Sequence, residues 1–425
     1  MCRPGRPRAN PATIPRRAKA PPYPAPMSLV DLTAHAEEFN ADPYPFYEAL
    51  RATGPVHQLV LGGERTWLVV GHQEAREALT HPALSKNWLG SELFEAAPVH
   101  AVATNMLDTD PPHHTRLRRL VAAEFTTRRV ESLRPRIQQI TDGLLDAMEA
   151  LPDRRADLIR SLAVPLPMTV ICELLGVPDL DRARFRYWSG EIVAPLDGVG
   201  ADPRVLGEMT SYLSELVAAK ADDPGDDLLS ALIRTRDGEG DRLSPDELIG
   251  MAFLLLVAGH ETTVNLIGNG VRALLAHPDQ LAALRADPDG LIDGAIEEML
   301  RYDGPVQHAT YRFADTDLEL GGVPIATGSS VMVALAAADR DPARFAGPGP
   351  GPEVFDIHRT GPSHLAFGHG IHYCLGAPLA RVEGRIAVRS LLERFPGLAE
   401  DPDAGPHDWL PGTLMRGVTR LPLRW

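Results

Sequence analysis

One stretch of the sequence decides the fold: Phe367–Gly368–His369–Gly370–Ile371–His372–Tyr373–Cys374–Leu375–Gly376–Ala377–Pro378–Leu379–Ala380–Arg381. It places one cysteine in a glycine-rich loop, just ahead of a helical run that we expect to continue to Arg394. The positive N-terminus of that helix would stabilise a thiolate, which is a strong, soft metal ligand. Gly368, Gly370 and Gly376 would let the backbone approach a flat cofactor where side chains would collide. We therefore predict that Cys374 binds iron.

Two other interpretations of this loop use the same residues. An isolated cysteine is more often a small buried hydrophobe, although the surrounding glycines argue against that. His364, His369, His372 and Cys374 could instead form a structural zinc site, since they offer nitrogen and sulfur ligands. Zinc sites favour paired ligands on two separate knuckles, and the sequence supplies no second pair.

The composition is that of an ordinary soluble globular protein, with 44% hydrophobic and 23% charged residues among 425. No repeat or long linker divides the chain, so we expect one large domain. A formal net charge of −15 disfavours binding to nucleic acid and anionic membranes. Three dispersed cysteines fit a reducing cytoplasm. The longest apolar run, Met251–Ala258, is far shorter than the ~20 residues that span a bilayer. We expect a cytoplasmic monomer without a membrane anchor.

Residues 1–26 differ from the rest of the chain. They combine six basic residues with eight prolines and contain no acidic residue. Such a segment cannot bury a core, so we expect a disordered N-terminal extension, with Met27 as a plausible start of the native protein. Residues 27–425 would then form the folded domain.

Hydrophobic periodicity and breaker residues predict a mainly α-helical fold with a small β portion. The longest predicted helix is Asp246–Ala276, which begins at the capping pattern Ser244–Pro245–Asp246–Glu247. The other elements expected from their patterns are helices Tyr44–Thr53, Gln73–Thr80 and Gly290–Tyr302, and strands Val56–Leu61, Thr66–Val70, Leu318–Leu320, Val323–Ile325 and Val331–Leu335.

The long helix contains the unusual run Ala258–Gly259–His260–Glu261–Thr262–Thr263. Thr262 can bond back to the carbonyl of Ala258 and, with Gly259, is expected to open or bend the helix. A hydroxyl and the neighbouring carboxylate of Glu261 can together deliver protons. The alternative is a core helix with one satisfied threonine.

Two further charge patterns lie on predicted helices. Glu298 and Arg301 are three residues apart and can pair, which is usually a feature of a solvated face. His114 and Arg118 are four apart and project from one face of a basic helix, which is also most often solvated.

These motifs follow one another in an order that resembles the cytochrome P-450 superfamily, from about Pro43 to Trp425. The phrases at Ala258–Thr263 and His364–Gly368 resemble its soluble bacterial branch in actinomycetes. The resemblance implies the cytochrome P-450 fold as a single large haem-binding domain. It implies haem b with Cys374 as the axial thiolate ligand.

The resemblance also assigns roles to residues around that cofactor. Glu261 and Thr262 would be the catalytic acid–alcohol pair, and Arg359 would join Glu298 and Arg301 in a buried structural triad. The remaining cofactor contacts implied by the resemblance are His114, Arg118, Arg312 and His364 for the propionates, and Ala258, Phe367, Gly368 and Gly376 near the haem.

The activity implied is that of a haem-thiolate monooxygenase, which inserts one oxygen atom of O₂ into a C–H bond of a lipophilic small molecule. A macrolide, a steroid, a terpenoid or another secondary metabolite would fit. No segment resembles a flavin or iron–sulfur domain, so a ferredoxin and its NAD(P)H-dependent reductase would supply electrons. A peroxygenase or an oxidative-coupling enzyme of the same fold is a second possibility. A haem-based sensor is a weaker one, because it has no need of Glu261 and Thr262.

The resemblance also implies which segments line the substrate pocket. Its expected members are mostly apolar: Trp88, Leu89, Leu93, Phe94, Met106, Phe253, Leu254, Val257, Ala258, the segment from Val306 to Ala309, Leu414 and Met415.

Overall fold

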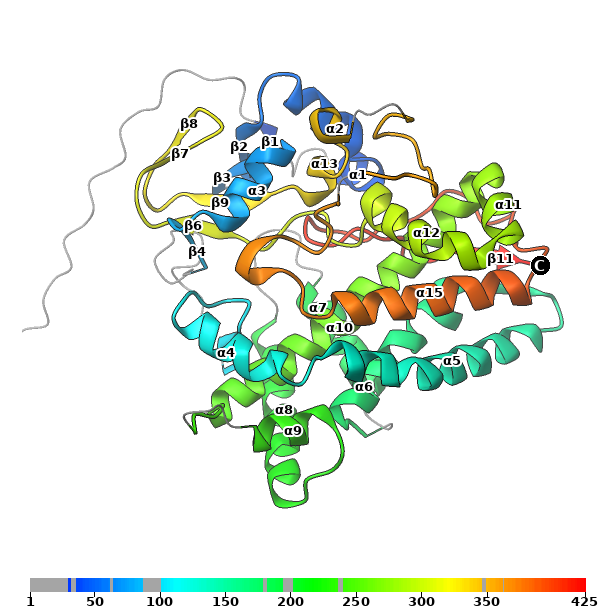
Figure 1. Cartoon of the computed structure of the whole chain (residues 1–425), viewed down its shortest axis with the longest axis horizontal. Coiled ribbons are helices and arrows are strands. Elements are labelled where there is room, and N and C mark those ends of the chain that lie inside the picture. The colour runs from blue at the N-terminus through cyan, green and yellow to red at the C-terminus, as the bar shows by residue number, and fades with distance from the viewer. Residues whose placement is uncertain are drawn as a thin grey trace, which may run out of the picture.

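The computed structural model describes residues 30–31, 36–61, 64–86, 101–178, 182–193, 202–235, 240–345, 349–361 and 363–425. The predicted extension at residues 1–26 lies outside these residues, so its disorder and the domain start at Met27 stay predictions. In the described part helices dominate; most strands gather at the upper left of the view, whereas β11 lies at the opposite end of the molecule, near the C-terminus (Figure 1). The expected mainly α architecture with a small β portion is confirmed.

Fifteen α-helices are described. Their bounds are α1 Ala36–Ala41, α2 Tyr44–Arg51, α3 His72–Thr80, α4 His113–Ala122, α5 Thr127–Glu149, α6 Pro165–Leu175, α7 Arg182–Val193, α8 Pro203–Asp222, α9 Leu228–Arg234, α10 Pro245–Ala276, α11 Pro278–Ala286, α12 Pro288–Asp303, α13 Leu335–Ala338, α14 Pro342–Phe345 and α15 Ala377–Arg394.

The central element is α10, which packs against α6, α8, α12 and α15. The predicted capping box is present: Ser244 caps the backbone of Glu247, and Glu247 returns a bond to Ser244. By length and composition α10 could cross a membrane, but 67% of its most apolar window is buried inside the protein. A core helix passes the same test, because it is apolar on most of its faces.

The main sheet has six strands in the order β1–β2–β3–β9–β6–β4. A hairpin, β7–β8, and a three-stranded sheet, β10–β11–β5, complete the β portion. The bounds are β1 Val30–Asp31, β2 Val56–Leu61, β3 Glu64–Val69, β4 Leu84–Ser85, β5 Arg155–Asp157, β6 Arg312–Ala314, β7 Leu318–Leu320, β8 Val323–Ile325, β9 Ser330–Val333, β10 Ala399–Glu400 and β11 Pro422–Arg424.

One predicted strand end is wrong. The strand expected to reach Leu335 ends at Val333, and Leu335 instead begins α13. The sequence predicted the three-residue strands β7 and β8 with their observed bounds, but it missed other strands of two or three residues, such as β4 and β5. Most segments this short show no alternation of their own and are fixed by their partners, as when β4 pairs with β6.

The predicted triad on α12 is formed. The Arg301 guanidinium donates two bonds to the Glu298 carboxylate, at 2.7 and 2.8 Å, and both side chains are almost wholly buried. Arg359 lies 3.3 Å from the same carboxylate, which also accepts a 2.8 Å bond from the backbone N–H of Asp356. The pair is therefore the rarer buried kind, and it joins α12 to the loop that precedes the cysteine segment.

Candidate active site

The cysteine loop lies where the sheet-rich part of the molecule meets the helices, and it leads into α15 (Figure 1). Gly368 and Gly370 have φ angles of 73° and 75°, in the left-handed region that favours glycine. A Cβ atom at Gly370 would also lie 2.7 Å from the Thr80 methyl carbon of α3. Gly376 has an ordinary helical φ of −79°, so its backbone does not require glycine, and its role beside a cofactor stays a prediction.

The Cys374 side chain is accessible although it lies deep within the protein, as a thiol does when it faces an internal space. Burial raises the pKa of this thiol. The backbone N–H groups of Gly376 and Ala377 at the start of α15, and the charges of Arg118 and Arg381, act to lower it. The helix N-terminus therefore favours the thiolate, as the sequence predicted.

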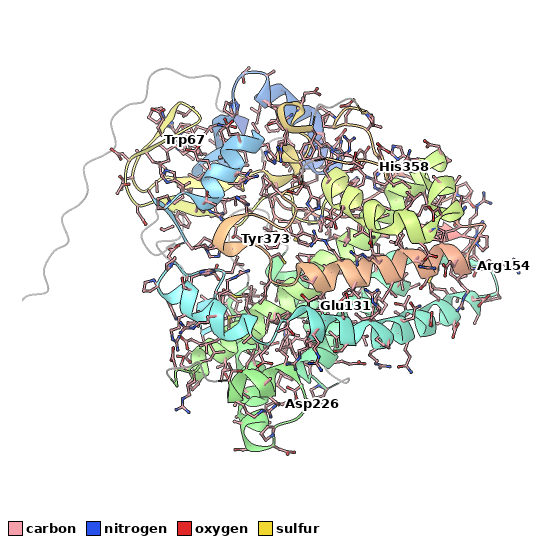
Figure 2. The ribbon with its side chains drawn as sticks, viewed as in Figure 1. Trp67, Glu131, Arg154, Asp226, His358 and Tyr373 are labelled. Atoms are coloured by element: carbon pink, nitrogen blue, oxygen red, sulfur yellow. The ribbon has the colours of Figure 1, made fainter. Side chains whose placement is uncertain are left out.

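On α4, His114 and Arg118 turn toward this loop. The Arg118 guanidinium donates a 2.6 Å bond to the carbonyl of Tyr373, which Figure 2 labels in the loop. His114 is buried, and both of its ring nitrogens lack a hydrogen-bond partner. Its ring stands 4.4 Å from the ring of His372, centroid to centroid. A buried imidazole without partners is costly, so these nitrogens fit a polar ligand.

Two more buried cations belong to this region. Arg312 on β6 is 4% exposed and Lys86 is 3% exposed. Burial, followed by the nearby charge of Arg312, lowers the pKa of Lys86 to about 7, although Asp108 and Asp110 act in the opposite direction. Burial lowers the pKa of Arg312 to about 10. Both guanidinium and ammonium would be stabilised by an added anion.

The structure does not place His364 with this group. Its Nδ1 accepts a bond from the N–H of Ala366, and its Nε2 contacts the Glu297 carboxylate at 3.2 Å. Arg381 pairs with the same carboxylate, and the His364 ring therefore lies against α12. The expectation that His364 holds a propionate is therefore corrected. His372 instead lies against His114, and Lys86 lies near Arg312; the sequence had suggested His372 only as a possible zinc ligand and had not singled out Lys86. The clue for His372 was its position two residues before Cys374.

On α10, Ala258 is exposed although most of the helix is buried in the core. The Thr262 hydroxyl donates a 2.8 Å bond to the Ala258 carbonyl, as predicted. The helix continues through this point without a break, so the expected opening is not seen. The Glu261 carboxylate lies 3.1 Å from the ring of the buried His260.

The expected substrate-pocket residues fall into three sets. Trp88, Leu89, Leu93 and Phe94 lie outside the described residues. Met106 is buried, and Phe253, Leu254 and Val257 of α10 are partly exposed on the same hydrophobic cluster. Val306 pairs with Met415 as an isolated β-bridge, and Gln307 donates to the carbonyl of Leu414, so the Val306–Ala309 and Leu414–Met415 segments are adjacent as expected.

Several arginines of α4 and α15, the two helices beside the cysteine loop, are paired with carboxylates. Arg116 pairs with Asp241 and Glu247, Arg381 with Glu297, and Arg385 with Asp293. Because each of these arginines is paired with a carboxylate, they offer little net positive charge to a partner protein.

The residues present fit an iron porphyrin. A thiol at a helix N-terminus offers an axial ligand, and buried cations with an unpartnered imidazole match two propionates. Within the described part of the chain, no three His, Cys, Asp or Glu side chains come together as a metal site, so a protein-only zinc centre has no support.

Comparison with known proteins agrees with this geometry. The family model for cytochrome P-450 matches residues 21–180 and 207–418. The chain is 57% identical over 398 residues to the cytochrome P-450 monooxygenase PikC of Streptomyces venezuelae, covering 93% of this chain and 94% of that protein. It is 45% identical over 402 residues to 6-deoxyerythronolide B hydroxylase of Saccharopolyspora erythraea, covering 92% and 97%.

A solved structure agrees as well. The tirandamycin C-bound P-450 monooxygenase TamI matches with a TM-score of 0.82 and 42% identity, over 91% of this chain and 98% of that one. The chain therefore belongs to the cytochrome P-450 family, and it is a haem-thiolate monooxygenase of lipophilic small molecules.

Proposed function

We propose that this monooxygenase hydroxylates a C–H bond of a macrolide-class polyketide, with electrons from a ferredoxin and its NAD(P)H-dependent reductase. The observation that carries the substrate proposal is the face of α10 made by Phe253, Leu254, Val257 and Ala258. These side chains stay partly or fully exposed on the central helix of the protein. Apolar side chains of a core helix remain accessible where they line an internal space.

The substrate class is favoured by the relatives. One is named for the hydroxylation of 6-deoxyerythronolide B, a macrolide, and one solved relative holds tirandamycin C. A large lactone presents an extensive apolar surface, which suits the apolar segments at Val306–Ala309 and Leu414–Met415.

The haem supplies the reduction of O₂ and the transfer of one oxygen atom to the substrate. Cys374 would hold the iron, and the N–H groups of Gly376 and Ala377 would stabilise the negative charge of its thiolate. His114, Arg118, Arg312 and His372 would hold the propionates, with Lys86 adding positive charge beside them.

Two side chains of α10, Thr262 and Glu261, are placed to transfer protons. The Thr262 hydroxyl donates to the Ala258 carbonyl. By rotating away from that carbonyl, it could hold a proton donor in the site. Glu261, whose side chain is 21% exposed, links the interior to solvent. We assign proton delivery to this pair.

We also propose that the protein acts as a cytoplasmic monomer. Residues 27–425 would form the folded domain, so a variant that begins at Met27 should still bind haem.

The test is a binding screen followed by turnover. Purified ferric protein is titrated with a macrolide aglycone, a steroid and a terpenoid, and the shift of the Soret band gives each dissociation constant. The macrolide should bind most tightly and, with ferredoxin, reductase and NADPH, yield a product with one added oxygen atom. Tenfold tighter binding of the steroid or terpenoid would overturn the substrate class. Turnover with hydrogen peroxide but not with ferredoxin would overturn the electron source.

A further inference from the structure

The buried side chain of His308 joins three separate parts of the chain. It belongs to the segment from Val306 to Ala309, which is proposed to line the substrate pocket, and it is 1% exposed. Its Nε2 lies 3.0 Å from the Tyr47 hydroxyl of α2, and its Nδ1 is hydrogen-bonded to the backbone carbonyl of Thr413. The ring therefore links residues that lie 261 positions before it and 105 positions after it in the sequence.

Each nitrogen of this ring has one defined role. A carbonyl only accepts, so Nδ1 carries the hydrogen and donates it to Thr413. Burial lowers the pKa of His308 to about 4 and raises the pKa of Tyr47, so both side chains are uncharged at neutral pH. Nε2 then has a free lone pair, which accepts the hydrogen of the Tyr47 hydroxyl. One neutral tautomer satisfies both contacts.

Aromatic rings of α1 and α2 hold the imidazole in a fixed orientation. The Phe39 ring is stacked on it, with planes 8° apart and centroids 6.3 Å apart. The Tyr47 ring meets it edge-on at 5.9 Å and also makes edge contacts with Phe39 and Phe46. Packing from two directions restricts rotation of the imidazole, so these two helices determine where its Nδ1–H points.

The bond to Thr413 acts on the turn that carries Leu414 and Met415, which are also proposed to line the pocket. Two backbone bonds of 2.9 Å hold residues 414–416 against residues 305–307. Those bonds use main-chain groups, so they do not depend on which side chains are present. The bond from His308 does depend on its side chain, and it holds the turn at the residue just before Leu414.

We propose that Tyr47 and His308 form a support that sets the position of the turn at Leu414 and Met415, and thereby determines which carbon of a bulky substrate is oxidised. Both side chains are 1% exposed, so they act through the turn and are positioning residues. This inference rests on the proposed function, because it takes the turn as part of the substrate pocket.

Three variants separate the support from general stability. His308→Phe keeps a ring in the aromatic cluster but can neither donate to Thr413 nor accept from Tyr47. Tyr47→Phe removes only the hydroxyl that holds Nε2. The matched control is Tyr44→Phe on the same helix, which loses a hydroxyl bonded to the Tyr302 carbonyl and the Asp303 carboxylate but not to His308.

The first experiment compares two ligands of different size in the purified ferric holoprotein. Imidazole and the long azole ketoconazole both coordinate haem iron through a ring nitrogen, and the Soret shift gives their dissociation constants. In His308→Phe we expect about fivefold weaker binding of ketoconazole, because a loosened turn must be ordered around it, and imidazole binding unchanged. Tyr47→Phe should show a smaller change in the same direction, and Tyr44→Phe none. Unchanged ketoconazole binding in His308→Phe, or equal weakening of both ligands, would overturn the support.

The second experiment reads the position of oxidation. With 6-deoxyerythronolide B, ferredoxin, reductase and NADPH, the distribution of oxygenated products should shift in His308→Phe and Tyr47→Phe but not in Tyr44→Phe. If the parent protein oxidises this macrolide and His308→Phe gives the same products in the same ratio, the support is refuted and the substrate class stands. If the parent protein does not oxidise it, the proposed substrate class is refuted, and the comparison of the two azoles still decides the support.

Discussion

Replacing Arg301 by alanine should strongly destabilise the protein, because its guanidinium is the centre of a buried network. It donates two bonds to Glu298, and the side chain is 3% exposed. It also donates to three backbone carbonyls, at 3.0, 2.8 and 3.1 Å, which belong to Asp339, Pro352 and Val354. Asp339 precedes α14 and the other two follow it, so this one side chain connects α12 to the chain on both sides of α14.

The magnitude follows from what the substitution leaves behind. Breaking a buried ion pair costs ~3–5 kcal/mol, since the partner charge stays buried. Glu298 keeps Arg359 and the N–H of Asp356, which limits that cost, whereas the carbonyls of Asp339 and Pro352 lose this donor and the Val354 carbonyl keeps a bond from Arg359. We expect about 4 kcal/mol in the free energy of unfolding, a large fraction of the ~5–15 kcal/mol typical of a domain.

The matched control is Arg359→Ala. Arg359 is 13% exposed and approaches Glu298 only at 3.3 Å, and its own bonds to backbone carbonyls lie nearer the surface, where water can replace them, so its removal should cost about 1.5 kcal/mol. In equilibrium urea unfolding followed by tryptophan fluorescence, with a slope of ~3 kcal/mol/M, the midpoint should fall by about 1.3 M for Arg301→Ala and about 0.5 M for Arg359→Ala. Equal midpoints for the two variants would refute this account of the triad.

Four other outcomes are expected. Cys374→His should lose the red-shifted Soret band of the reduced carbon-monoxide complex, and a retained band would exclude Cys374 as the ligand. Arg118→Ala should lower haem occupancy, measured as haem absorbance per protein, severalfold more than Arg119→Ala; equal occupancies would count against the propionate role. Thr262→Ala should keep NAD(P)H consumption while hydrogen peroxide replaces product, with an unchanged substrate dissociation constant; an unchanged product ratio would make Thr262 a packing residue. Gly370→Ala should destabilise the loop, because φ is 75° and the new methyl would meet Thr80, and an unfolding midpoint equal to that of the parent protein would contradict this.

Much of this protein could be predicted from local patterns. The cap at Ser244, the long helix that follows and the back-bonded Thr262 depend on residues within one or two turns, so spacing alone identifies them. The left-handed glycines of the cysteine loop are local for the same reason. Even the Glu298–Arg301 pair lies on one helix face, and only its burial had to come from the fold.

Contacts between segments far apart in the chain could not be predicted from local sequence patterns. His364 and His372 stand eight residues apart in one loop, and their sequence neighbourhoods do not say which ring turns toward α4. Glu297 on α12 draws His364 away, and the packing of α4 brings His114 to within 4.4 Å of His372, centroid to centroid. Lys86 becomes part of the site because β4 pairs with β6 and carries it beside Arg312.

The sequence by itself determined the capped long helix, the glycine conformations of the cysteine loop and the back-bonded Thr262, since each is encoded within a few consecutive residues. Only the tertiary structure decided which cations gather beside the cysteine loop and that His260 meets both Ser189 and Glu261. Those choices depend on buried charges finding partners across segments far apart in the chain, and the free energy of burial is settled only when the whole core has formed.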